Sequence, residues 1–150
     1  MIDQQAAFLY AEDDPDDRLL AEMAHRESGV RNPLVFVADG QEALDWLRRE
    51  SRHTDRNDLP RPGIVLLDLN MPGIDGRETI RLIRADERIR RIPAVILTTS
   101  AAEADIRASY EAGANAYIVK PIAFGDLVRI FSSLATFWFD ISSLARETSP

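Results

Sequence analysis

Cysteine is absent from the 150-residue chain, which excludes disulfide bonds and metal sites built from thiolates. Apolar runs long enough to span a bilayer are also missing, as is the charged and then apolar segment that opens a secretory signal. We therefore expect a cytoplasmic protein that has no membrane partner.

Positive charge is scarce: 18 lysine and arginine residues stand against 25 aspartate and glutamate residues, for a formal net charge of -7. Nucleic-acid binding draws most of its affinity from basic side chains that neutralise phosphates, so this composition disfavours it and favours a protein partner. Neither of the two histidines, His25 and His53, has a metal or catalytic partner at a recognisable spacing. Both are expected to be ordinary exposed residues.

Five short apolar runs alternate with helical patterns along the chain. The runs are rich in β-branched and aromatic residues, as is typical of parallel strands covered on both faces, and they span residues 8–11, 34–37, 64–67, 94–97 and 116–119. A capping Asp14, a following Pro15 and a closing Gly29 mark the first helix. Repeated units of strand and helix with right-handed crossovers predict an α/β fold of the (βα)5 type, with a doubly wound, parallel, five-stranded sheet.

The length of the chain fits one domain, residues 1–150, with a core of about residues 6–135. Apolar residues recur at helical spacing between positions 127 and 141, so the last helix is expected to extend past residue 135. Residues 136–150 would then form a helical extension and a tail.

Ionisable and hydroxyl side chains follow four of the predicted strands. They are the acidic run Glu12-Asp13-Asp14, Asp68, the hydroxyl run Thr98-Thr99-Ser100, and Lys120. Because the carboxyl ends of parallel strands meet at one edge of the sheet, we expect these groups to converge there. Clustered carboxylates need a cation, and oxygen ligands with no cysteine or histidine nearby favour Mg2+, which also binds phosphate oxygens. The sequence therefore predicts a magnesium site beside a place for a phosphoryl group.

Several motifs together resemble the receiver domains of two-component response regulators. They are Glu12-Asp13-Asp14-Pro15 after the first strand, the run from Leu66 to Gly76 around Asp68, Thr98 after the fourth strand, and Tyr117-Ile118-Val119-Lys120-Pro121 at the fifth. The likeness covers about residues 6–135 and implies a flavodoxin-like receiver fold, here with an extended C-terminal helix. It also implies a cis peptide bond between Lys120 and Pro121.

The resemblance implies a role for each matching residue at the metal site. Asp68 is the expected phosphoacceptor, which attacks the phosphoryl group of a phosphohistidine on a histidine kinase. Asp13 and Asp68 are expected to bind Mg2+ through carboxylates, Asn70 through its backbone carbonyl, and Glu12 through a metal-bound water. The chemistry is consistent, since a carboxylate can attack phosphorus to give an acyl phosphate.

A second group of matching residues is expected to bind the phosphoryl group or to respond to it. Lys120 would pair with a phosphoryl oxygen, and the Thr98 hydroxyl would move to bond the group while Tyr117 rotates into the vacated space. Thr99 is bulkier than the alanine or glycine often found there in the family, which predicts partial shielding of the acyl phosphate. Asn70 occupies a position that tunes how fast water removes the group.

Some neighbouring residues suit structural roles better than functional ones. Asp14 precedes a proline at the predicted start of a helix, so it is expected to cap that helix rather than to bind metal. Gly73, Asp75 and Gly76 are expected to shape the loop after Asp68 and to start the next helix.

Three aromatic side chains, Phe137, Trp138 and Phe139, lie past the usual end of a receiver domain and need cover. With Phe131 on the last helix they form a candidate partner face. Two interpretations are open: these side chains fold back onto their own domain, or they form a homodimer interface, where aromatic residues are enriched, and the second is favoured. Together with the long polar loop expected at about residues 48–62 and the stretch Leu97-Thr98-Thr99-Ser100, the tail resembles the small response regulators paired with bacterial phytochromes.

The expected function is a phosphorylation-dependent signalling switch rather than an enzyme with a separate substrate. It would accept a phosphoryl group from a histidine kinase, of the phytochrome type on the narrower resemblance, and catalyse its own aspartyl phosphorylation and dephosphorylation. It would signal by protein contact without a DNA-binding output domain. A phosphatase of the haloacid dehalogenase class would need a second aspartate where Asn70 stands. A nucleotide-binding protein would need a glycine-rich loop after the first strand, and a phosphorylation-independent module would lack residues such as Asp68 and Lys120.

Overall fold

The computed structural model describes residues 6–48 and 61–145, and strands alternate with helices through both ranges. The strands are β1 (Ala7–Ala11), β2 (Leu34–Val37), β3 (Pro62–Leu67), β4 (Ala94–Thr98) and β5 (Ala116–Val119). The helices are α1 (Pro15–Ser28), α2 (Gly40–Arg48), α3 (Gly76–Ala85), α4 (Glu103–Ala112), α5 (Phe124–Ala135) and a final π-helical turn, η2 (Thr136–Ile141). The predicted (βα)5 order is confirmed.

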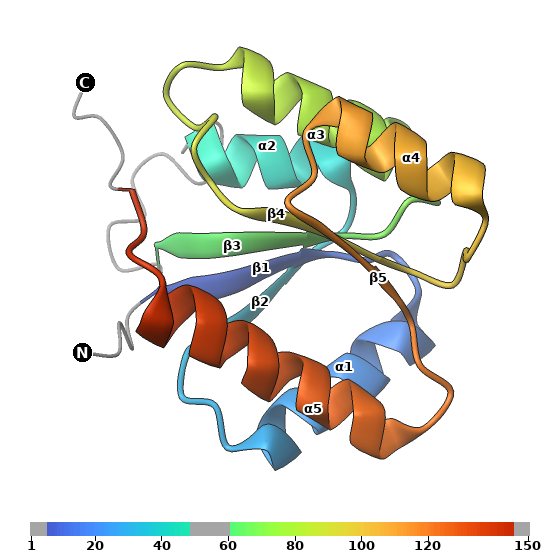
Figure 1. Cartoon of the computed structure of the whole chain (residues 1–150), viewed down its shortest axis with the longest axis vertical. Coiled ribbons are helices and arrows are strands. Elements are labelled where there is room, and N and C mark those ends of the chain that lie inside the picture. Colours follow the sequence, from blue (N-terminus) through green and yellow to red (C-terminus); the bar gives the residue numbers. More distant parts are fainter. Residues whose placement is uncertain (1–5, 49–60, 146–150) are drawn as a thin grey trace.

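All five strands are parallel and lie in the order β2-β1-β3-β4-β5. Helices α1 and α5 cover one face of the sheet, and α2, α3 and α4 cover the other (Figure 1). The chain places β2 on one side of β1 and then β3 on the other, so the direction in which strands are added reverses at β1. In doubly wound sheets, ligands bind beside such a reversal, at the carboxyl ends of the strands. Within the described ranges, no helix is both long and apolar enough to cross a membrane.

The inner strands are apolar on both faces because helices cover both. Every residue of β1, β3 and β4 is buried, whereas the edge strands β2 and β5 are mostly half-buried. Alternate residues point to opposite faces, so Leu9 joins the core beside α2 and α3, while Phe8 and Tyr10 join the core beside α1 and α5. Burial of each large apolar side chain contributes about 1.5–3 kcal/mol, and the strand ends are fixed as a result.

Helix α1 begins and ends where the sequence predicts. The Asp14 side chain accepts hydrogen bonds from the backbone N–H groups of Asp16 and Asp17, at 2.8 and 3.2 Å. Pro15 takes the first helical position, and Gly29 ends the helix at a φ of 74°, a left-handed conformation that glycine adopts without strain. The cap therefore fixes the first turn of α1 close to the end of β1.

The C-terminal aromatic residues are divided between the core and the surface. Phe131 and Phe139 are 0% and 2% exposed, and both rings contact Phe8 edge-on, at 5.6 and 5.0 Å between centroids. The prediction that these two residues face a partner is therefore wrong for the folded domain, and the fold-back alternative describes them. Trp138 is half-buried, and Phe137 remains 51% exposed.

Phe139 reaches the core because β3 leaves space for its ring. Gly63 is buried beside it, and a Cβ atom on this glycine would lie 2.6 Å from the ring. The turn η2 follows α5 directly, so the predicted extension past residue 135 is confirmed, and it packs against β3. Any side chain at position 63 would therefore clash with the ring of Phe139 in its buried position.

His25 is half-buried, contrary to the expectation that it is exposed. Its Nε2 atom lies 2.7 Å from the backbone carbonyl oxygen of Asn32, and its ring contacts Phe8 and Phe131 edge-on. The reason is its place on the face of α1 that packs against α5. His53 and most of the polar loop expected around it lie outside the described residues.

Replacing Phe139 with alanine is expected to lower the free energy of unfolding by about 3–5 kcal/mol, the usual cost of removing a buried aromatic ring. Phe137→Ala is the matched control on the same turn, and we expect a change of less than about 1 kcal/mol because that ring is 51% exposed. Urea denaturation followed by circular dichroism measures both values. Equal losses in the two variants would contradict the placement of Phe139 in the core.

The acid stability of the protein is expected to depend on Asp86, which joins the end of α2 to the segment after α3. Hydrogen bonds from Arg88 and Arg48 lower the pKa of this carboxyl group from 3.8 to about 2. A carboxyl group whose pKa is lower in the folded state than in the unfolded state stabilises the fold fully when the pH is above the unfolded-state pKa. That contribution is lost as the pH falls through the folded-state pKa. Asp86→Asn should therefore lower the free energy of unfolding near neutral pH.

The difference between Asp86→Asn and the unmodified protein should shrink as the pH falls from about 4 to about 2 and vanish at still lower pH, where the Asp86 carboxyl group is protonated and neutral like asparagine. Urea titrations at a series of pH values measure it. A difference that stays constant down to about pH 2 would show that the loss comes from packing and not from the charge.

Candidate functional site

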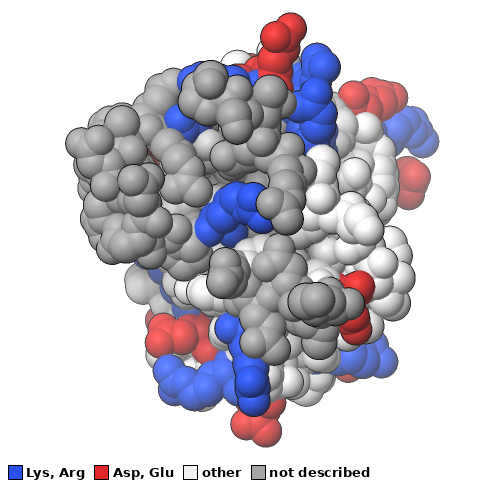
Figure 2. All heavy atoms as spheres, turned by 90° about the vertical axis from the view of Figure 1, so that its left-hand side faces the viewer, with Lys and Arg blue, Asp and Glu red and all other residues white. Residues whose placement is uncertain are grey.

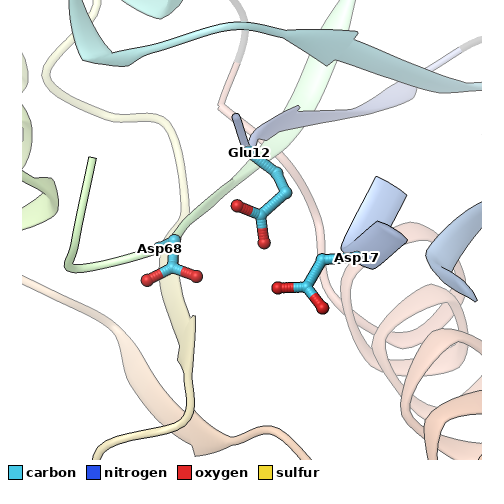
Figure 3. A group of neighbouring side chains, drawn as sticks. All are labelled: Glu12, Asp17 and Asp68. Atoms are coloured by element: carbon cyan, nitrogen blue, oxygen red, sulfur yellow. The ribbon is translucent and has the colours of Figure 1, made fainter. Parts of the chain in front are cut away.

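Charged and hydroxyl side chains meet at the carboxyl edge of the sheet, as predicted. Glu12 follows β1 and Asp68 follows β3, while Thr98 ends β4 and Lys120 follows β5. Since the strands are parallel, these four strand ends lie at the same edge. Asp17 joins them from the first turn of α1, and Figure 3 shows the carboxylates of Glu12, Asp17 and Asp68 pointing toward one another.

The Lys120 ammonium group lies at the centre of these carboxylates, and this residue is the only lysine in the sequence. Its Nζ atom donates hydrogen bonds to Glu12 Oε1 at 2.6 Å, to Asp68 Oδ2 at 2.7 Å and to Asp17 Oδ2 at 3.0 Å. These contacts use all three N–H donors of an ammonium group. The peptide bond to Pro121 is trans, like every peptide bond of the described ranges, so the cis bond that the resemblance implies is not observed.

Burial and charge shift the pKa values around this ammonium group. Burial raises the pKa of Glu12, and hydrogen bonding to Lys120 offsets only part of that rise. Burial alone would lower the pKa of Lys120, but hydrogen bonds to the carboxylates of Asp68, Glu12 and Asp17 raise it above its ordinary value. Lys120 is therefore a cation at physiological pH, while burial raises the pKa of Tyr10 and keeps its phenol neutral.

Three carboxylates share one ammonium group, which leaves uncompensated negative charge at this edge. One oxygen from each of Glu12, Asp17 and Asp68 lies within 4.8 Å of the others. Asp13, next to Glu12, adds an exposed carboxylate. A divalent cation that prefers oxygen ligands would reduce the repulsion, so the residues at this edge fit a hard divalent metal ion.

Basic side chains gather at the opposite end of the molecule. Figure 2 views the face where the strands begin and shows arginine side chains near its centre. A pocket between the starts of β3 and β4 is lined in part by Arg61, Arg88 and Arg91. The acidic edge and these arginines therefore lie at opposite ends of the sheet.

The Asp68 carboxylate is held through both oxygens. Oδ1 accepts hydrogen bonds from the backbone N–H of Asn70 at 3.0 Å and from the Thr98 hydroxyl at 3.3 Å. Oδ2 faces Lys120 at 2.7 Å. A carboxylate that is fixed beside a cation is suited to attack an anionic group such as a phosphoryl group.

The loop after Asp68 requires glycine at position 76. The Gly76 backbone N–H donates to the Leu69 carbonyl at 3.2 Å, and a Cβ atom on Gly76 would lie 2.4 Å from the Asp68 carbonyl oxygen. Asp75 caps α3 by accepting a hydrogen bond from the backbone three residues on. Gly73 has a φ of 76°, which favours glycine. The predicted structural roles of these residues agree with the geometry.

Asp13 and Asn70, two of the predicted metal ligands, lie at the rim of the site. Both residues are exposed, and Asp13 is not among the converging carboxylates of the described ranges, whereas the predicted ligand of Asn70 is its backbone carbonyl. Asp17 lies in that group but was not among the residues predicted from sequence. A signal was available, because Cα–Cβ bonds of a helix tilt toward its N-terminus, and the first turn of α1 therefore points back toward the end of β1.

The predicted switch residues lie at the end of β4, directly after it, and on β5. Thr98 is buried with its hydroxyl toward Asp68, whereas Thr99 is exposed. The Tyr117 hydroxyl donates a hydrogen bond to the Ser100 carbonyl at 2.8 Å. The tyrosine ring is thus tied to the segment that follows β4.

Comparisons with known proteins agree with this geometry. Response regulator Rcp1 of Synechocystis sp. is 35% identical over 136 residues, which cover 91% of this chain and 90% of Rcp1. A similar solved structure is response regulator RPA3017, in red light signaling of R. palustris, with 40% identity, 94% and 99% coverage of the two chains and a TM-score of 0.88. Another is the phosphorylated cyanobacterial phytochrome response regulator RcpA, with 36% identity, 94% and 99% coverage and a TM-score of 0.82. The Mn2+-bound form of Rcp1 has 33% identity, the same coverage and a TM-score of 0.79.

The sequence model of the response regulator receiver domain family matches residues 8–132 of this chain. This range reaches from β1 into α5, so it contains the carboxyl ends of all five strands and the residues that converge there. Relatives of similar length share the fold along almost their whole chains, and one of them binds a divalent metal ion. The chain therefore belongs to the response regulator receiver domain family.

Proposed function

We propose that this receiver domain is phosphorylated on Asp68 by a histidine kinase and signals through contacts that depend on the phosphoryl group. The observation that carries the proposal is the distance of 2.7 Å between Lys120 Nζ and Asp68 Oδ2. A lysine in this position supplies positive charge where the equatorial oxygens of the phosphoryl group must lie during transfer.

The proposed transfer forms one bond and breaks another. An oxygen of Asp68 attacks phosphorus in line with the bond to the imidazole nitrogen of the kinase histidine. The P–N bond breaks, the imidazole takes up a proton, and an acyl phosphate remains on Asp68. Thr98 and Asn70 hold Oδ1, which leaves Oδ2 directed toward Lys120 and the incoming group.

We infer that the divalent ion of this site is Mg2+, which prefers carboxylate, carbonyl and phosphate oxygens. Asp13 and Asp68 would bind it through carboxylates, Asn70 through its backbone carbonyl and Glu12 through water. When bound, the ion supplies positive charge to the transferring phosphoryl group and reduces the repulsion among the carboxylates. Glu12 also accepts a hydrogen bond from Lys120 Nζ at 2.6 Å, so its carboxylate would interact with both the lysine and the hydrated metal ion.

The response to phosphorylation is proposed to begin at Thr98. Its hydroxyl lies 3.3 Å from Asp68 Oδ1, and a small shift would bring it to a phosphoryl oxygen. Tyr117, whose hydroxyl bonds Ser100, would carry that shift to the segment between β4 and α4. Thr99 is exposed beside them and would limit the access of water to the acyl phosphate. Added charge would thus change the shape of the face formed by α4, β5 and α5.

The kinase is proposed to dock at the rim of the site near α1. Large apolar side chains are exposed on α1 and just after β5, and they are Leu19, Leu20, Met23 and Ile122. Three of them lie within residues 19–23 of α1, and a cluster of exposed apolar side chains marks an interaction surface. Because RcpA, a similar protein, is a phytochrome response regulator, we propose a kinase of the phytochrome type.

We also propose that the chain removes its own phosphoryl group, so that it acts as a timed switch. Water would attack phosphorus in line with the acyl oxygen, and Asp68 would be released as a carboxylate. Asn70 is exposed at the rim of the site, where it can influence this water. Phosphorylation by a histidine kinase would place the protein in the cytoplasm.

Acetyl phosphate and Mg2+ are expected to add one phosphoryl group, about 80 Da, to the unmodified protein and none to Asp68→Asn. Excess chelator should abolish the adduct, because the phosphoryl oxygens then lose the charge of the ion. Intact-mass spectrometry measures the adduct. An equal adduct on Asp68→Asn would refute the assignment of the phosphoacceptor, and no adduct on the unmodified protein would favour a phosphorylation-independent interaction module.

A homodimer contact is proposed at Phe137 and Trp138. The two rings pack edge-on at 4.8 Å between centroids, and Phe137 is largely exposed, as is Ile141 on the same turn. Exposed aromatic side chains are typical anchors of protein interfaces. Phe131 and Phe139 support this surface from the core and take no direct part in it.

Size-exclusion chromatography with light scattering, with and without acetyl phosphate, is expected to find a dimer that Phe137→Ser shifts toward monomer, since the variant loses an apolar anchor. Ile122→Ser is the control, because it removes an exposed apolar side chain outside the tail. A monomer under both conditions, or equal shifts in both variants, would reject this interface.

A further inference from the structure

Asp17 is the carboxylate of the site to which the proposed chemistry gives no role. Its Oδ2 atom accepts a hydrogen bond from Lys120 Nζ at 3.0 Å, beside the contacts of that ammonium group with Glu12 and Asp68. The proposed metal ligands are other residues, and the acyl phosphate forms on Asp68. Asp17 is therefore placed to act on the reaction through Lys120.

The start of α1 fixes the position of Asp17. Asp14 Oδ1 accepts hydrogen bonds from the backbone N–H groups of Asp16 and Asp17, so the first turn is held at both residues. The Asp17 side chain is 39% exposed, and that of Glu12 is 2% exposed. One carboxylate thus binds the ammonium group from the solvent side and the other from the interior.

We propose that Asp17 is a positioning residue for phosphoryl transfer, which orients the Lys120 ammonium group so that one N–H points at the group arriving on Asp68. This inference rests on the proposed phosphorylation of Asp68. It gives the first turn of α1 a part in the reaction in addition to its part in the fold.

The geometry of an ammonium group supports this role. Its three N–H bonds are arranged tetrahedrally, so fixing two of them fixes the third. Glu12 and Asp17 accept two, and the third points at Asp68 Oδ2, 2.7 Å away. During transfer the hydrogen bond from this third N–H can move from Asp68 to a phosphoryl oxygen. The hydrogen bonds to Glu12 and Asp17 remain in place. The four-carbon stem of lysine is flexible, and a poorly oriented cation would slow the reaction.

The charge of Asp17 by itself would act in the opposite direction. A carboxylate near the site repels an anionic phosphoryl donor, and its removal would then speed the reaction. The sign of the change in rate therefore separates the orienting effect from simple repulsion.

The test compares Asp17→Ala, Asp17→Asn and Asp16→Ala with the unmodified protein. Each is incubated at saturating Mg2+ with a range of acetyl phosphate concentrations, and intact mass against time gives the rate constant at saturation and the half-saturating concentration. Calorimetric titration gives the affinity for Mg2+. Asp16→Ala is the matched control, because Asp16 is an exposed carboxylate on the same turn.

Asp17→Ala is expected to lower the rate constant at saturation by about fivefold to tenfold, the effect of roughly one oriented hydrogen bond in the transition state. Asp17→Asn keeps an oxygen acceptor in the same place and should retain most of the rate. Asp16→Ala should match the unmodified protein. Loss of the Asp17 charge should weaken Mg2+ binding by less than about tenfold, because Asp17 is near the proposed ligands but is not one of them.

The single lysine allows a direct check of orientation. Protein labelled with 15N-lysine has one side-chain ammonium group, that of Lys120. Its NMR signal should be sharp in the unmodified protein and in Asp16→Ala, because hydrogen bonds slow exchange with water. It should weaken or shift in Asp17→Ala.

A rate constant for Asp17→Ala equal to or above that of the unmodified protein would overturn the inference. Binding of Mg2+ by Asp17→Asn that is weaker by much more than about tenfold would also overturn it, since Asp17 would then be a ligand of the metal ion. The adduct on the unmodified protein tests the proposed function separately, and its absence would remove that function together with the role of Asp17.

Discussion

One ammonium group shared among three carboxylates is the interaction on which this site depends. Lys120 follows β5, Glu12 follows β1 and Asp68 follows β3, and only a parallel sheet brings these three chain segments to one edge. Without the cation, carboxylate oxygens within 4.8 Å of one another would repel and push the strand ends apart. The same residues therefore stabilise the edge and present it to an anionic group. Any ion or phosphoryl group that enters must share these contacts.

The helix starts and the loop after Asp68 hold this arrangement as much as the charged side chains do. Asp14 caps α1 and so fixes the turn that carries Asp17, while Gly76 lets the start of α3 lie against the carbonyl of Asp68. Such features tolerate little substitution, although none of them carries the charge that the chemistry needs.

Much of the fold and part of the site could be predicted from the sequence. Strands buried on both faces are nearly continuous apolar runs, and residues that directly follow them, such as Asp68 and Lys120, need only the strand order to be placed. Asp17 was missed because its approach depends on how α1 is rotated, which packing decides. Phe139 and His25 were placed wrongly for a similar reason, since each lies against residues far away in sequence, among them Gly63 and Phe8.

The packing of Phe139 also changes where this domain ends. The match to the family stops at residue 132, and a boundary after Ala135 would retain all five units of strand and helix. Such a boundary would nevertheless remove the ring that covers Gly63 and touches Phe8, on the strands whose far ends lead to Asp68 and Glu12. Cutting this chain at the end of the region it shares with the family would therefore remove part of its hydrophobic core.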